Sequence, residues 1–292
     1  MDIILKLSEE LGIRKSQAEA AVKLIDEGNT IPFIARYRKE VTGSLNDEVL
    51  RNLYERLTYL RNLEERKETV LNSIEEQGKL TDELKAQILA AETMVAVEDL
   101  YRPYKPKRRT RATIAKERGL EPLANVITLQ MLNTPLEAEA AKFINPEKEV
   151  NTAEDALNGA KDILAESVSD EADYRTRIRD LTMKKGHVIS TAKDPEAESV
   201  YEMYYEFDEP VNKLAGHRIL ALNRGENEKI LNVKVEAPEE DILRFLERKV
   251  ITRDNPNTTP VLKEVVADAY DRLIAPAIER EIRSSLTEMA ED

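Results

Sequence analysis

The sequence predicts a mainly α protein, a multi-helix bundle with a long central helix and a small α/β insertion near residues 187–237. Only 9 of the 292 residues are glycine, aromatic residues make up 5% and charged residues 35%, which favours surface helices over a β sandwich. Leucines recur at helical spacing between residues 46 and 77. β-like character is confined to residues 187–192 and 230–237, where apolar and β-branched residues cluster.

Residues 46–77 form the longest periodic segment and predict the central helix. Its leucines from Leu50 to Leu60 follow 3-4-3 spacing, which places them on one face of a helix. Glu64 and Lys67 fall where this apolar stripe should continue. A helix of this length extends roughly 48 Å at 1.5 Å per residue, so we expect it to act as a strut through the core.

Shorter helices flank this strut, and capping or terminating residues bound them. Gly28 and Gly43 suit helix ends, and Thr30 suits the start of a helix over residues 30–43. Before the insertion, helices are also expected at residues 3–11, 16–27, 81–91, 94–101, 113–118, 121–131, 135–144, 152–168 and 174–185. Later helices are expected from residue 215 to a stop at Gly225, at residues 238–251 and at residues 261–274, and Pro276 is expected to kink or restart a last helix.

The change in character after Gly186 predicts two domains. The first is a helical domain over residues 1–186, and the second is a helical segment with a small β element over residues 187–292. In the last helix an apolar stripe is formed by Ile278, Ile282, Leu286 and Met289. Such a stripe requires a cover. Either earlier helices supply it, or the chain is cut from a longer protein.

Composition excludes several classes of function. The absence of cysteine removes disulfides, thiol catalysis and Cys-ligated zinc. The start of the chain lacks the pattern of a signal peptide, and no apolar run approaches the ~20 residues needed to span a bilayer. We therefore expect a cytoplasmic protein without a membrane partner. The net charge of −13 argues against nonspecific coating of nucleic acid by the whole surface.

Residues 102–118 form a basic strap that differs from the rest of the chain. This stretch contains eight lysines or arginines against one acid, Glu117. Pro103 and Pro106 disfavour helix, so we expect the strap to begin as an extended, partly rigid segment. Clustered cations of this kind bind nucleic-acid phosphates, and Tyr101 and Tyr104 offer ring faces for base stacking. The candidate phosphate contacts are Lys105, Lys107, Arg108, Arg109 and Arg111.

A second reading of the basic strap is equally open. In a chain with 57 acidic residues, the strap can dock on carboxylates of its own protein. Arg36, Arg38 and Lys39 are further candidate contacts, but they spread around a helix, so not all three can face one ligand.

No catalytic or metal site is predicted. His187 and His217 are 30 residues apart and have no metal-ligand spacing, and the chain has neither a Walker sequence nor GxGxxG nor GxSxG. We therefore predict no metal, no cofactor and no enzymatic activity.

Several blocks of the sequence resemble the bacterial transcription accessory protein Tex family. The blocks are TIPFIARYRKEVTG at residues 30–43, EDLYRPYKPKRRTR at 98–111, KERGLEPLA at 116–124 and GHRILALNRGE at 216–226. They occur in order over essentially the whole chain. The resemblance implies the N-terminal helical region of a larger protein, in which a YqgF-type ribonuclease-H-like domain, helix-hairpin-helix motifs and a C-terminal S1 domain follow.

The sequence departs from the family by stopping before those domains. The family's S1 domain, its module best suited to nucleic acid, is therefore not in these 292 residues. The family is also similar to a eukaryotic transcription elongation factor, which implies a scaffold role in transcription. Two hypotheses follow. In the first, the chain contacts the RNA or DNA backbone nonspecifically through the basic strap, beside the transcription machinery. In the second, it is a protein-interaction scaffold that packs against the missing C-terminal domains and binds no nucleic acid itself.

Overall fold

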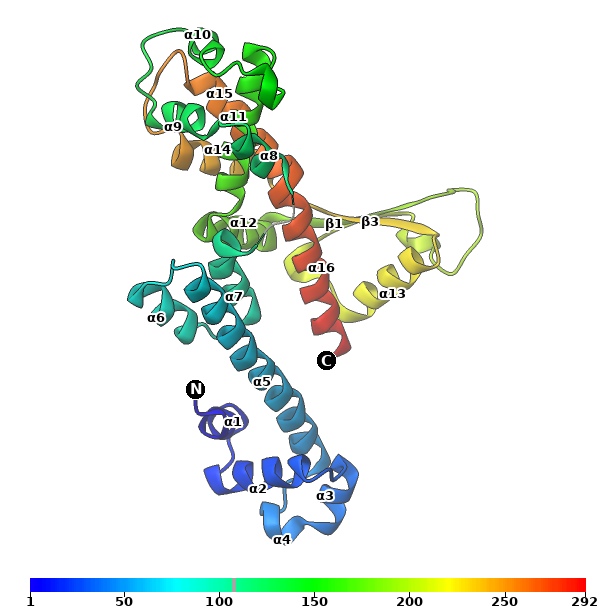
Figure 1. The fold of residues 1–292 in the computed structure, drawn as a ribbon. Helices are drawn as coiled ribbons and strands as arrows, with labels where there is room; N and C mark the ends of the chain where they lie inside the picture. The colour runs from blue at the N-terminus through cyan, green and yellow to red at the C-terminus, as the bar shows by residue number, and fades with distance from the viewer. Residues whose placement is uncertain (107–108) are drawn as a thin grey trace. The chain divides into compact units, whose positions relative to one another are not determined.

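The computed structural model describes residues 1–106 and 109–292, which divide into two compact units, Met1–Lys105 and Pro106–Asp292 (Figure 1). Helices make up most of both units, and the second unit also contains a three-stranded sheet. The predicted fold class, mainly α with a small α/β insertion, is confirmed.

Unit 1 is a set of helices arranged along one long helix. Its elements are α1 (Ile3–Leu11), α2 (Lys15–Asp26), α3 (Ile31–Tyr37), α4 (Lys39–Thr42), α5 (Asp47–Glu76), α6 (Asp82–Ala90), α7 (Met94–Tyr101) and the 3-10 turn η1 (Arg102–Tyr104). The single helix predicted over residues 30–43 is wrong. Arg38 leaves the helical conformation at φ −129° and ψ 30°, and this separates α3 from α4.

Helix α5 is the predicted strut, and it begins where the Asn46 side chain accepts a hydrogen bond from the Val49 N–H at 2.9 Å. Its first half packs with α1, α2 and α3 around a leucine-rich cluster (Figure 1). Its second half packs with α6 and α7 around a separate cluster. One apolar stripe therefore serves two cores, and its buried residues are Leu50, Leu53, Leu57, Leu60, Leu63, Val70 and Ile74.

Lys67 occupies the stripe where the sequence pattern lapses, and its side chain is only 2% exposed. Its ammonium donates to the Leu89 carbonyl oxygen at 2.8 Å and lies 3.2 Å from a carboxylate oxygen of Glu64. Leu89 belongs to the last turn of α6, where carbonyl groups lack helical partners. The buried charge is thus stabilised by a hydrogen bond that also fixes the end of α6 on α5.

Arginines on α5 tie the neighbouring helices to it. Arg56 donates two hydrogen bonds to Glu10 of α1, at 2.8 and 2.9 Å, and Arg61 donates two to Asp26 of α2, at 2.7 and 2.9 Å. These hydrogen bonds hold the pKa of Glu10 and of Asp26 below the ordinary values of 4.5 and 3.8.

Unit 2 begins with a helical layer and continues through the sheet. Its elements are α8 (Arg111–Glu117), α9 (Glu121–Leu129), α10 (Leu136–Ala141), α11 (Ala153–Ser169), α12 (Ala172–Lys185), β1 (His187–Ala192), β2 (Glu206–Pro210), α13 (Gly216–Asn227), β3 (Leu231–Glu236), α14 (Glu239–Val250), α15 (Thr259–Asp268), the π-helical turn η5 (Ala269–Ile274) and α16 (Ala275–Glu291), with 3-10 turns η2 (Pro146–Lys148), η3 (Glu202–Tyr204) and η4 (Val211–Lys213).

The sheet has the order β2-β1-β3, with β1 antiparallel to both neighbours. His187 pairs with Pro210 on one side and with Glu236 on the other. The sequence predicted β1 and β3 but missed β2. This five-residue edge strand, EFDEP, buries only Phe207 and contains no β-branched residue, so it lacks the alternating apolar signal.

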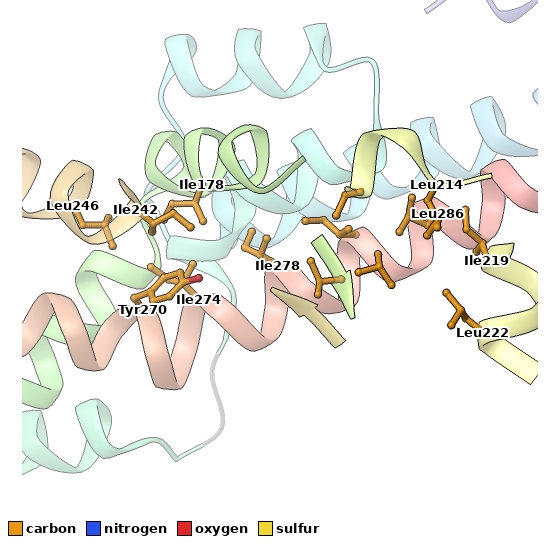
Figure 2. Packing of buried hydrophobic residues seen from close by; sticks show 14 of the residues in the cluster. Ile178, Leu214, Ile219, Leu222, Ile242, Leu246, Tyr270, Ile274, Ile278 and Leu286 are labelled. Carbon is orange, nitrogen blue, oxygen red and sulfur yellow. The ribbon is translucent and has the colours of Figure 1, made fainter. Parts of the chain in front are cut away.

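Two apolar clusters form the core of unit 2. Small and branched residues of α8, α9 and α11 make the first, and α12 to α16 surround the second with the sheet. Figure 2 shows part of the second cluster, in which Ile178, Ile242 and Ile274 lie close together. Helix α11 contributes to both, with Ala160 in the first and Val168 in the second.

The chain itself covers the apolar stripe of the last helix. Ile278, Ile282 and Leu286 are 3%, 1% and 2% exposed, because α13 and the sheet pack against α16. Of the two predicted alternatives, burial of the stripe by earlier helices is confirmed for these three residues. Met289, at 58% exposed, is the member of the stripe that stays at the surface.

The predicted boundary between residues 186 and 187 stays a prediction. The chain divides into its two compact units between Lys105 and Pro106. Residues on both sides of the predicted boundary, Ile178 and Val188, belong to one apolar cluster of unit 2.

The arginine pairs of unit 1 make its stability depend on acid pH. A carboxylate whose pKa is lowered in the folded state stabilises that state above its unfolded pKa, and the contribution disappears as pH falls through the folded value. We expect the free energy of unfolding of the double variant Glu10→Gln, Asp26→Asn to be lower than that of the parent by about 0.5 kcal/mol per pair near neutral pH. The effect is small because both pairs are partly exposed. The difference from the parent protein should vanish as pH falls below 3.8.

Urea unfolding at a series of pH values measures this difference. The variant Glu55→Gln, Glu68→Gln removes two exposed carboxylates of α5 that form no ion pair with a residue the structure describes, so it is the control. If the free energies of unfolding of the parent and the double variant differed by the same amount at every pH, the two arginine pairs would not be the cause of the pH dependence.

Candidate nucleic-acid interface

The basic strap belongs to both units. Lys105 ends unit 1, whereas Arg109 and Arg111 lie in unit 2, and the candidate contacts Lys107 and Arg108 lie outside the described residues. The strap was predicted to start extended, but its first residues form the 3-10 turn η1, in which the Lys105 N–H donates to the Tyr101 carbonyl at 2.9 Å. Extended backbone begins at Lys105, at φ −63° and ψ 126°.

The two tyrosines of the strap differ in exposure. Tyr101 is 7% exposed, its hydroxyl pairs with the Ser73 hydroxyl at 2.9 Å, and the Arg66 guanidinium lies 5.3 Å from its ring centre. Stacking on a base would require this ring to leave its packed site. Tyr104 is half-buried, and its backbone carbonyl accepts a hydrogen bond from Gln77 at 2.7 Å. Tyr104 is therefore the better placed of the two stacking candidates.

Of the six strap cations that the structure describes, Arg102, Arg109 and Arg118 form ion pairs, with Asp99, Glu117 and Glu149, and the other three form none with a described residue. Lys105 and Arg111 are exposed, and neither forms an ion pair with any residue in the described part of the chain. Arg109 approaches Glu117 at 3.2 Å, but both side chains are mostly exposed, at 71% and 60%. Lys116, which the sequence reading did not name as a contact, is also exposed and has no ion-pair partner among residues 1–106 and 109–292. Its position on the exposed side of α8 was the signal that could have identified it.

Helix α8 is held tightly, and this fixes Arg111 at its first turn. The Thr110 side chain accepts from the Thr113 N–H at 3.2 Å and donates to a carboxylate oxygen of Glu166 on α11 at 2.9 Å. Ala115 packs against α11 where Gly159 leaves room. A Cβ at Gly159 would lie 2.2 Å from a methyl carbon of Leu120 and 3.3 Å from the Ala115 Cβ.

The second set of candidates lies in unit 1 around the break between α3 and α4. The Arg36 guanidinium lies 5.5 Å from the Tyr37 ring centre, and that of Arg38 lies 5.0 Å from the Phe33 ring centre. Lys39 is exposed. The arginines thus stack on neighbouring aromatic rings and keep their charge near the surface. Because these residues and Arg111 belong to different units, contact with one common ligand stays a prediction.

In the described residues no three histidine, cysteine, aspartate or glutamate side chains come together in a way that could hold a metal ion. Nor does any helix in that part of the chain combine the length and the apolar character that crossing a bilayer requires.

These features define a mainly α protein built of two helical units, with a basic segment in which Lys105 and Arg111 are exposed and form no ion pair with a described residue. Comparison with known families gives the assignment. Residues 1–75 match the Tex-like protein N-terminal domain, and residues 133–292 match the Tex central region-like family. The chain therefore belongs to the Tex family.

Relatives occur in bacteria and in animals. The uncharacterized protein YdcI of Bacillus subtilis is 47% identical over 98% of this chain and 40% of its own length. The transcriptional accessory protein Tex of Neisseria gonorrhoeae is 46% identical over 82% of this chain and 32% of its own length. The human S1 RNA-binding domain-containing protein 1 is 31% identical over 99% of this chain and 30% of its own length. This chain thus spans less than half the length of each of these relatives.

Gly159→Ala tests how firmly α8 is seated. The added methyl group meets the buried Leu120 side chain, so we expect the free energy of unfolding to fall by about 1–2 kcal/mol, although alanine is the better helix former. Asn158→Ala, one residue away on the exposed side of α11, is the control and should match or exceed the stability of the parent. Thermal unfolding followed by circular dichroism measures both, and an unchanged midpoint for Gly159→Ala would contradict the close packing.

Proposed function

We propose that this chain is the N-terminal and central part of a Tex-like transcription accessory protein, and that it contacts the nucleic-acid backbone without sequence preference. The contacts are Lys105, Lys107, Arg108, Arg109 and Arg111, with Arg36, Arg38 and Lys39 as further contacts. The observation that carries the proposal is the exposure of Lys105 and Arg111 without an ion-pair partner among the described residues. The proposal assigns a binding role and no catalytic step.

The relatives support the nature of the ligand and the setting. One is named a transcriptional accessory protein, and another carries an S1 RNA-binding domain in its name. We infer that this chain acts beside the transcription machinery in the cytoplasm. An S1 domain elsewhere in the whole protein would supply most of the affinity for RNA, and the basic strap would add phosphate contacts that depend on salt.

A second function is favoured by the contacts of Thr110 and Arg109. Thr110 donates to Glu166 of α11, and Arg109 lies beside Glu117, so part of the strap already packs on its own unit. In this alternative the strap fixes the chain for packing against other domains or proteins, and nucleic acid does not bind to it.

The triple variant Lys105→Ala, Arg109→Ala, Arg111→Ala separates the two functions. Each backbone contact to duplex DNA adds about 0.9 to the slope of log K against log salt. If all three cations meet phosphates, the slope falls by up to about 3 and affinity falls at low salt, while the thermal midpoint stays unchanged. Fluorescence anisotropy with labelled DNA and RNA across a salt series measures the slope.

The control removes one lysine and two arginines elsewhere. Lys79, Arg248 and Arg280 are exposed and form no ion pair with any residue that the structure describes, so their replacement by alanine matches the charge change. Equal losses in the two triple variants would show only a net-charge effect. A lower thermal midpoint with unchanged nucleic-acid binding would favour the packing function.

Tyr104→Leu tests base stacking separately from charge. Leucine retains apolar contact with the cluster of α5 to α7 but lacks an aromatic face. Stacking on one base contributes about 1–3 kcal/mol, so single-stranded RNA should bind at least about fivefold more weakly. Binding to duplex DNA, whose bases are already stacked, should not change. If Tyr104→Leu weakened the binding of single-stranded RNA and of duplex DNA equally, or weakened neither, Tyr104 would not stack on a base.

A further inference from the structure

A cavity of about 210 Å³ lies within unit 2, away from the residues of the basic strap. It is bordered by β3, the start of α14, the π-helical turn η5 and α16. The residues that matter for its chemistry are Glu236, Glu239, Tyr270, Asp271, Ile278 and Glu279. The space exceeds what a single water molecule requires, so a small organic group can enter.

Two buried polar side chains of the described chain, Thr182 and Tyr270, line this cavity, and the Thr182 hydroxyl donates to the Ile178 carbonyl at 2.8 Å. Tyr270 is 5% exposed and its ring packs beside Ile274 in the core (Figure 2). Its hydroxyl forms no hydrogen bond with a residue that the structure describes, and its oxygen is still reached by solvent. Burial, with added repulsion from Glu239, Asp271 and Glu279, raises the pKa of Tyr270 to about 12. The hydroxyl is therefore neutral near pH 7, and its oxygen is able to accept a hydrogen bond.

The charge around Tyr270 is predominantly negative. Four carboxylates, from Glu236, Glu239, Asp271 and Glu279, border the cavity against the single ammonium of Lys234. None of the four forms an ion pair with a residue in the described ranges. Glu279 is held in place because one of its oxygens accepts the Val235 N–H at 3.0 Å. An anion would be repelled here, and a cation would gain from each carboxylate.

The backbone of this wall is also unusual. The turn η5 is π-helical over Ala269–Ile274, and it carries both Tyr270 and Asp271 into the cavity wall. It directly precedes α16, whose second residue, Pro276, lacks a backbone donor for the regular helix ladder. Single π-helical turns inside α-helices are frequent at functional sites.

We propose that this cavity binds a primary alkylammonium group. The ammonium donates a hydrogen bond to the Tyr270 hydroxyl oxygen and is attracted by the surrounding carboxylates, and its alkyl stem lies against Val235 and Ile278. A metal ion is a poorer match, because in the described chain these carboxylates do not converge as a ligand set. The group is carried either by a free polyamine or by a lysine side chain of a partner protein. The proposal does not rest on the nucleic-acid function.

Tyr270→Phe is the decisive variant. The hydroxyl has no protein partner in the described structure, so its removal should leave the thermal midpoint unchanged. The full chain, labelled at isoleucine and valine methyl groups, is titrated with n-butylammonium and followed by nuclear magnetic resonance. In the parent protein the methyl groups of Val235 and Ile278 should shift. In Tyr270→Phe the dissociation constant should rise about tenfold, because a hydrogen bond to a charged group is lost.

The controls distinguish a site from general attraction. Tyr54→Phe removes the hydroxyl of an exposed tyrosine in unit 1 and should bind n-butylammonium as the parent does. Tetramethylammonium, which has the charge but no N–H donor, should leave the two methyl groups unshifted. Equal affinity in Tyr270→Phe and parent, or no shift with n-butylammonium, overturns the proposal.

Two further probes identify the source of the ammonium group. Spermidine represents a free polyamine, and Nα-acetyl-lysine methylamide represents a lysine side chain. Tighter binding of either one than of n-butylammonium supports the proposal and names the source. Binding of neither at the concentrations at which n-butylammonium shifts the methyl groups overturns it, because both carry the same group.

Discussion

The fold depends on one recurring constraint, the burial of a single helical stripe that serves two separate apolar clusters. In unit 1 the stripe of α5 supplies Leu53 to the first cluster and Val70 to the second. In unit 2, α11 contributes in the same way to both clusters. Because each long helix is fixed at both ends by packing, the shorter helices take their positions from it. The cations of α8 and the carboxylates around η5 are presented on helices held in this manner.

Much of the fold could be predicted from the sequence, because long periodic helices carry their own signal. The leucine spacing of α5 and the cap at Thr152 gave helices close to those observed. The break at Arg38 could not be predicted, since no glycine or proline marks it in the sequence. Strand β2 lacked an alternating pattern. Lys67 interrupts the stripe in sequence but fills it in space, because its ammonium reaches the Leu89 carbonyl.

The candidate site, too, could be predicted from the sequence only in part. Composition alone located the basic strap, because eight cations within seventeen residues are conspicuous in an acidic chain. It could not separate Tyr101 from Tyr104, since burial of the Tyr101 ring depends on contacts with Ser73 and Arg66 that are distant in sequence. The cavity at Tyr270 gave no sequence signal at all. Its carboxylates come from four elements, β3, α14, η5 and α16, of a chain with 57 acidic residues, and only the fold brings them together.

Lys105 and Arg111 form no ion pair with a described residue, and this affects how easily they could bind a phosphate. An exposed ion pair contributes only about 0–1 kcal/mol, so Lys105 loses little by having no partner, whereas Arg111 lies close enough to Asp162 for its charge to oppose the burial that raises the pKa of that carboxyl. An incoming phosphate need not break an internal ion pair with a described residue to reach Lys105 or Arg111. Arg109 would exchange Glu117 for the ligand, and because that pair is mostly exposed, the exchange costs little. Arg66 is different, since it both donates to Glu98 and covers the Tyr101 ring, so its charge is committed to the fold. The strap thus combines Arg111, held on α8, with Lys105 on extended backbone, and neither charge is committed to an ion pair with a described residue.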